Sequence, residues 1–167
     1  MNTQFGMLEN VFPLLIPLDR TATAAATPYV DLKTVNSLSF LVYYGALTGA
    51  STGDAVTVTV ECSSTSASSA SEVAIAFKYR KSAATGTNTW GAVTDATSSG
   101  VTMAENADDN KALLIEVDPA VVAAAKSDAR YVRLVLTPAG SYSASTGAVI
   151  GFIDPIYKQT TMISAAS

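Results

Sequence analysis

Apolar and polar residues alternate along much of this chain with a period of two. The clearest stretch, residues 54–62 (DAVTVTVEC), has an apolar side chain at every second position: Val56, Val58, Val60 and Cys62. Successive side chains of a β-strand point to opposite faces, so this pattern is typical of a strand with one face in a core. The same alternation predicts strands over residues 73–80, 111–118 and 130–137.

Two other segments also have the composition of strands. Residues 38–45 (LSFLVYYG) are apolar on both faces, which predicts a central strand covered on both sides. Residues 148–155 (AVIGFIDP) predict a last strand that ends at Pro155, because proline has no N–H for a ladder hydrogen bond. Gly-rich and Ser-rich stretches at residues 48–53 and 63–71 predict turns between the strands.

One short helix is predicted after residue 118. Asp118 can cap it, Pro119 suits the first helical position, and Ala120 to Lys126 favour a helix. Several short strands with one linking helix predict an all-β fold, an antiparallel β-sandwich of which a jelly roll is one form. We expect three zones: an extended N-terminal arm over residues 1–28, a β-sandwich domain over 29–157 and a C-terminal tail over 158–167.

The arm holds an apolar segment that prolines keep extended, and its six large side chains are candidate partner-binding residues: Val11, Phe12, Leu14, Leu15, Ile16 and Leu18. Burying six such side chains yields roughly 9–18 kcal/mol. Fixing the backbone of about eight residues costs on the order of 8–16 kcal/mol. The segment therefore needs a good apolar groove. It can form an extra edge strand on its own domain, or dock on a neighbouring subunit by β-augmentation.

Composition favours a subunit of an assembly. Hydrophobic residues make up 49% of the chain and charged residues 14%, below the roughly 25% of an average soluble domain. A charge-poor surface is weakly protected against association. The net charge is −4 and the ten Lys and Arg residues are scattered, so we expect no nucleic-acid partner. The first 20 residues resemble neither a signal peptide nor a membrane span, which predicts a protein made in the cytoplasm without a membrane stage.

Few side chains in this sequence could support catalysis or bind a metal ion. Histidine is absent and Cys62 is the only cysteine, so we expect no cofactor and no metal site. Residues 49–53 (GASTG) match a nucleophile elbow, but a strand is predicted after them and no histidine could take the serine proton. Glycoside hydrolysis needs only paired carboxylates, and the candidates for it are Asp54, Glu61, Glu72, Glu116 and Asp118. We expect these carboxylates to be hydrated and the chain not to be an enzyme.

Three further features have structural interpretations. The acidic stretch at residues 105–110 lacks the spacing of a calcium loop and predicts a solvated turn. Trp90, the only tryptophan, is interpreted as a core or interface anchor, and Cys62 as a buried thiol.

Residues 90–155 carry a series of short motifs in a fixed order. It begins with Trp90-Gly91-Ala92-Val93-Thr94-Asp95 and runs through Gly100-Val101-Thr102, Asp109-Asn110-Lys111, Leu114-Ile115-Glu116-Val117-Asp118-Pro119 and Arg130-Tyr131-Val132-Arg133-Leu134-Val135-Leu136 to Asp154-Pro155. This series resembles the small virion proteins of tailed bacteriophages, of the capsid decoration or cement type. The resemblance implies a β-sandwich that coats a capsid lattice, and no catalytic residue comes with it.

We therefore expect a decoration protein on the virion surface, whose partners are the major capsid protein and further copies of itself in a dimer or trimer. One alternative is another phage structural role, in a head–tail connector or tail. A second is a carbohydrate-binding sandwich, whose exposed aromatic residues would be Trp90, Tyr43, Tyr44 and Tyr142.

Overall fold

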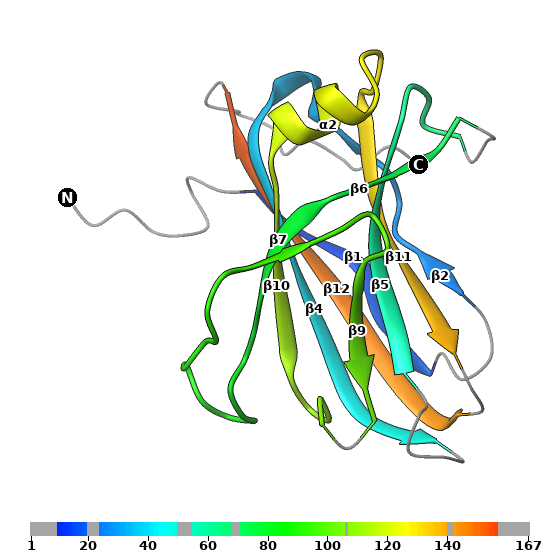
Figure 1. Cartoon of the computed structure of the whole chain (residues 1–167), viewed down its shortest axis with the longest axis vertical. Coiled ribbons are helices and arrows are strands. Elements are labelled where there is room, and N and C mark those ends of the chain that lie inside the picture. Colours follow the sequence, from blue (N-terminus) through cyan, green and yellow to red (C-terminus); the bar gives the residue numbers. More distant parts are fainter. Residues whose placement is uncertain are drawn as a thin grey trace.

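Two antiparallel sheets packed face to face form the protein, as Figure 1 shows. The computed structural model describes residues 10–19, 24–49, 55–67, 71–105, 107–139 and 142–156. The two packed antiparallel sheets confirm the predicted all-β sandwich.

The first sheet, sheet A, contains six strands. Their order is β1 (Asn10–Asp19), β12 (Tyr142–Pro155), β4 (Val35–Gly49), β10 (Ala112–Val117), β7 (Phe77–Lys81) and β8 (Thr94–Ala96). Sheet B has the order β2 (Ala25–Ala26), β11 (Tyr131–Ala139), β5 (Ala55–Ser63) and β6 (Val73–Ile75). In sheet B, β3 (Val30–Asp31) also pairs with β11, and β9 (Val101–Ala104) also pairs with β5. A 3-10 turn, η1, covers Leu32–Thr34.

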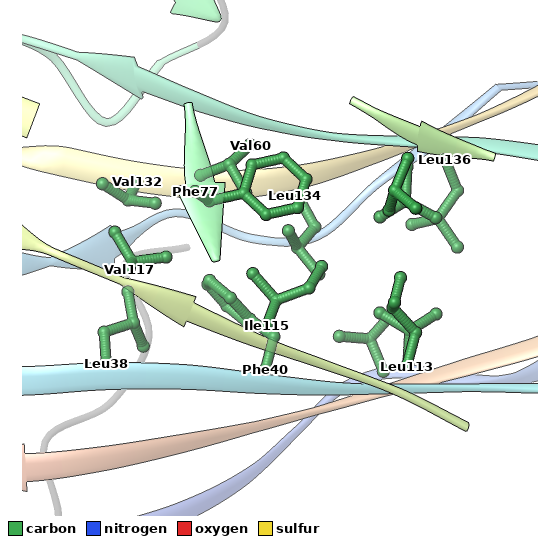
Figure 2. Close-up of a cluster of buried hydrophobic side chains, with 14 of the residues drawn as sticks. Leu38, Phe40, Val60, Phe77, Leu113, Ile115, Val117, Val132, Leu134 and Leu136 are labelled. Atoms are coloured by element: carbon green, nitrogen blue, oxygen red, sulfur yellow. The ribbon is translucent and has the colours of Figure 1, made fainter. Parts of the chain in front are cut away.

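The core lies between the two sheets and follows the alternation of the sequence. Along β5 and β11 every second side chain is buried, and along β10 Leu113, Ile115 and Val117 point inward. In Figure 2, Leu113 and Ile115 of sheet A face Leu134 and Leu136 of sheet B across the interior. Packing of these two apolar faces holds the sheets together.

The predicted helix is present as α2 (Pro119–Ala125). The Asp118 side chain accepts a hydrogen bond from the Ala120 N–H at 2.8 Å, and Pro119 occupies the first turn. Val122 is the buried residue of this helix. The cap, the proline and one apolar contact account for so short a helix.

The strand predicted over residues 73–80 is wrong in one respect, because the chain changes sheets at Ala76. Residues 73–75 form β6 in sheet B and residues 77–81 form β7 in sheet A, and the ribbon crosses between them in Figure 1. Ile75 and Phe77 both face the core, whereas Val73 is 37% exposed. Because both of these side chains stay inward across the change of sheet, the alternation of apolar and polar residues is unbroken. The sequence pattern therefore does not reveal the crossing.

The acidic turn predicted to be solvated contains a buried carboxylate instead. Asp108 is only 6% exposed, and its Oδ2 accepts hydrogen bonds from the Ala104 N–H at 2.9 Å and from Lys81 Nζ at 2.7 Å. The next residue, Asp109, accepts one from the Leu47 N–H at 2.9 Å. Asp108 thereby links β9 of sheet B to β7 of sheet A. A buried carboxylate needs such partners, and spacing in the sequence does not show them.

The two faces of β10 offer a matched test of the core. Leu113 is fully buried, while its neighbour Leu114 points outward and is partly exposed. We expect Leu113→Ala to lower the free energy of unfolding by about 2–5 kcal/mol, because it leaves a cavity. Leu114→Ala should cost about 1 kcal/mol or less. Urea denaturation measures both variants, and equal losses would show that the assigned faces are wrong.

An ion pair joins the start of β11 to the end of β3. Arg130 Nε donates to Asp31 Oδ1 at 2.9 Å, and Asp31 also accepts from the Lys33 N–H. The hydrogen bond from Arg130 is the main cause that holds the pKa of Asp31 below its usual 3.8. Asp31 therefore stabilises the fold in its ionised form.

This lowered pKa sets a pH dependence. The contribution of Asp31 should be fully present above pH 3.8 and lost as the pH falls through the lowered folded-state pKa. We expect Asp31→Asn to destabilise the protein at pH 7 and to have little effect in strong acid. Thermal unfolding of both proteins across this range tests the expectation, which a pH-independent difference would contradict.

Candidate interaction surface

Strand β1 is the edge of sheet A, built from the segment expected to act as an arm. It pairs antiparallel with β12, with Val11 opposite Phe152 and Pro13 opposite Ile150. Of the two possibilities left open by the sequence, the structure shows the extra edge strand on the chain's own domain.

The six apolar residues of this segment differ in their surroundings. Leu14 is 6% exposed and packs so closely on Gly151 that a Cβ there would lie 2.7 Å from Leu14 Cδ1. Phe12 and Leu15 are partly buried against the core. Val11 is partly exposed and Ile16 is 66% exposed. Leu18 lies opposite Gly147, but its side chain falls outside the described part of the structure.

The outer edge of β1 is poorly suited to pairing with another strand. Pro13 and Pro17 both lie in it, and neither has an N–H to donate. Prolines on an edge strand block continuous ladders with other chains. A partner at this edge would therefore be held by side chains more than by an added strand.

An apolar row crosses sheet A on the side away from sheet B. In the register, Pro13 lies opposite Ile150, Ile150 opposite Leu41, and Leu41 opposite Leu114. Directly opposed residues share one face of a sheet. The neighbouring rows add Val11, Phe152 and Tyr43. We call these seven residues the outer face of sheet A: Val11, Pro13, Leu41, Tyr43, Leu114, Ile150 and Phe152.

Exposure shows that this outer face is accessible. Tyr43 is 47% exposed, and Leu41, Leu114 and Ile150 are partly exposed. The prediction that β4 is covered on both sides is therefore wrong for its outer side among the described residues. β4 does lie centrally, between β12 and β10. Apolar residues on both faces of residues 38–45 are the sequence signal for this surface, and the same pattern is also typical of a strand packed on both sides.

Charged side chains border the outer face along β7. Arg80 lies opposite Leu114 and Lys78 opposite Glu116, and Lys78 Nζ contacts Asp95 Oδ1 of β8 at 2.6 Å. The apolar surface therefore covers β1, β12, β4 and β10 and ends at a rim of mixed charge.

The outer side of sheet B is different, because a polar network ties it together. Arg133 contacts Glu61 at 2.9 Å and Glu72 at 2.8 Å, and its guanidinium lies 4.9 Å from the centre of the Tyr29 ring. The Tyr29 hydroxyl donates to Glu72. Burial, followed by this hydrogen bond, raises the pKa of Tyr29 to about 12. The structure thus brings Glu61 and Glu72 together around Arg133, which forms an ion pair with each of them.

Two other candidate carboxylates, Glu116 and Asp118, line a cavity of about 590 Å³ at the end of sheet A. Asp118 is also the cap of α2. The fifth candidate, Asp54, and residues 50–53 of the elbow-like motif lie outside the described residues. The strand expected after that motif is present as β5.

The single cysteine and the aromatic residues singled out in the sequence lie partly in the core and partly at the surface. Cys62 is buried as predicted. Trp90 is 36% exposed in an isolated bridge with Ser82, so it does not anchor the core. Tyr44 is buried and does not present an aromatic ring at the surface, and the side chain of Tyr142 lies outside the described residues.

Neighbouring residues of β1 test whether this strand belongs to the fold. We expect Leu14→Ala to destabilise the protein by about 2–5 kcal/mol, because it removes buried contacts to Gly151 and the core. Ile16→Ala should change stability by about 0.5 kcal/mol or less, because Ile16 is exposed. Chemical denaturation separates the two outcomes. If Leu14→Ala were neutral, β1 would not be held on its own domain in solution.

Within the described ranges, no three His, Cys, Asp or Glu side chains are grouped so that they could hold a metal ion, and no helix is long and apolar enough to cross a bilayer. No family model, curated protein or solved structure matches the chain.

Proposed function

We propose that this chain is a capsid decoration protein of a tailed bacteriophage, which binds the assembled shell and stabilises it by bridging neighbouring capsid subunits. The observation that carries the proposal is the apolar, accessible outer face of sheet A on a charge-poor sandwich. The phage assignment rests on the resemblance of residues 90–155 to small virion proteins.

The outer face suits adhesion to a large, repeated partner. Removing apolar surface from water yields about 25 cal/mol for each Å², so a face of seven residues gives a modest contact in each copy. Many copies on one lattice add such contacts, and binding that favours the assembled shell stabilises it by mass action. No bond is made or broken in this mechanism.

Strand β1 has a specific part in this proposal. By pairing with β12 it adds Val11 and Pro13 to the outer face and extends the apolar row to four strands. Of the six arm residues predicted to bind a partner, Val11 and Ile16 keep the exposure that such a contact needs, whereas Leu14 belongs to the core. A dimer or trimer of the chain remains a prediction.

Purified particles of the phage that encodes the chain test the proposal. We expect hundreds of copies in each particle by quantitative mass spectrometry. Shells stripped of the protein should bind it again and resist heat better afterwards. About a dozen copies would indicate a connector or tail component, and absence from the particle would overturn the proposal.

Matched variants show which surface binds the shell. Tyr43→Asp places a charge on the outer face of sheet A at an exposed position, and we expect at least a tenfold loss of shell binding, about 1.4 kcal/mol. Val135→Asp places the same charge on the outer side of sheet B and should bind normally. The reverse pattern would assign shell binding to sheet B.

A further inference from the structure

A cavity of about 590 Å³ opens where sheet A loses one of its strand contacts. β10 and β7 pair from Leu113 opposite Lys81 as far as Glu116 opposite Lys78. Beyond that point the chain at Ala76 crosses to sheet B. Val121 of α2 also lines the cavity, and α2 lies at the upper end of the molecule in Figure 1. Ala76 is another lining residue, so the cavity adjoins the point where the chain changes sheets.

The cavity has an apolar floor. Leu38, Phe77, Ala96 and Val117 are all buried residues of the sandwich, and Val121 of α2 adds a partly buried side chain. Pockets of roughly 300–1,000 Å³ that are mostly apolar, with a few convergent polar groups, are typical of binding sites for small groups. Its size and lining fit this description.

Polar side chains at the rim give the cavity a negative charge. Among the described residues that line it, the rim carries the carboxylates of Asp95, Glu116 and Asp118 and one cation, Lys78. Lys78 is already paired with Asp95 at 2.6 Å. Glu116 makes no hydrogen bond or ion pair with another described residue, and Asp118 uses one oxygen to cap α2. Lys78 lies opposite Glu116 in the register, but among the described residues neither Glu116 nor Asp118 forms a direct ion pair with it.

We infer that the cavity receives the basic side chain, lysine or arginine, of a partner polypeptide. The aliphatic stem of such a side chain matches the apolar floor, and its cationic head matches Glu116 and Asp118. The hydroxyls of Ser37 and Ser39, which also line the cavity, can accept further hydrogen bonds from that head. The inference rests on this cavity alone and does not depend on shell binding.

Short peptides test the inference directly on the whole protein. The probes are acetyl-Leu-Lys-Leu-amide, its arginine analogue and the same lysine peptide acetylated at Nε, each titrated at low salt and followed by the amide NMR signals of Ser39, Val117 and Val121. We expect saturable shifts, with the lysine and arginine peptides binding about tenfold or more tightly than the acetylated one, the effect of losing one charge-assisted contact.

Variants then assign the preference to the rim. Glu116→Gln combined with Asp118→Asn should abolish the difference between charged and acetylated peptides; Asn also caps helices, and Glu116→Gln alone should reduce the difference. Asp128→Asn, which changes an exposed carboxylate paired with Lys126, should leave it unchanged. Ser37→Trp should block all three peptides. Equal binding of charged and acetylated peptides, shifts away from the cavity, or a preference that survives in the double variant would each overturn the inference.

Discussion

The structure depends on one interaction, the packing of the inner apolar face of sheet A against that of sheet B. Leu38, Phe40, Leu113 and Ile115 contribute from one side and Val60, Leu134 and Leu136 from the other (Figure 2). Each strand can supply only alternate side chains to this core. The second face of every strand is therefore available for something else, and the two sheets use it differently.

On the outer side of sheet B, Arg133 pairs with both Glu61 and Glu72 in a polar network. Sheet A leaves Leu41, Leu114 and Ile150 on its outer side, and β1 widens this apolar surface. An apolar patch on the face that the core does not use is typical of an interaction surface. This asymmetry between the sheets is the physical basis for assigning adhesion to sheet A.

The two-residue period of the apolar side chains, the capping residues and the turn-forming residues were sufficient to predict the sandwich and the short helix α2. The inward sets of β5, β10 and β11 follow directly from the alternation, and Asp118 with Pro119 marks the start of α2. These signals are local, so they can be recognised without knowing what lies across the core. The doubly apolar segment at residues 38–45 also marked the central strand correctly.

Features that depend on distant partners could not be predicted in the same way. The burial of Asp108 requires hydrogen bonds from Lys81 and from the Ala104 N–H. The sheet change at Ala76 keeps both Ile75 and Phe77 pointing into the core, so the sequence pattern continues across it. The location of β1 on its own domain depends on the open edge of β12 and on the space above Gly151. The cavity at Glu116 and Asp118 likewise lies where the printed pairing of β7 with β10 ends, which the sequence does not show.

The central claim is that the outer face of sheet A is the surface that meets the shell. Hydroxyl-radical footprinting of the protein, free and bound to particles, tests it most directly, because Tyr43 and Trp90 are both exposed and reactive. The account predicts that Tyr43 becomes protected on the particle while Trp90 stays reactive. Unchanged oxidation of Tyr43 on fully decorated particles would contradict it.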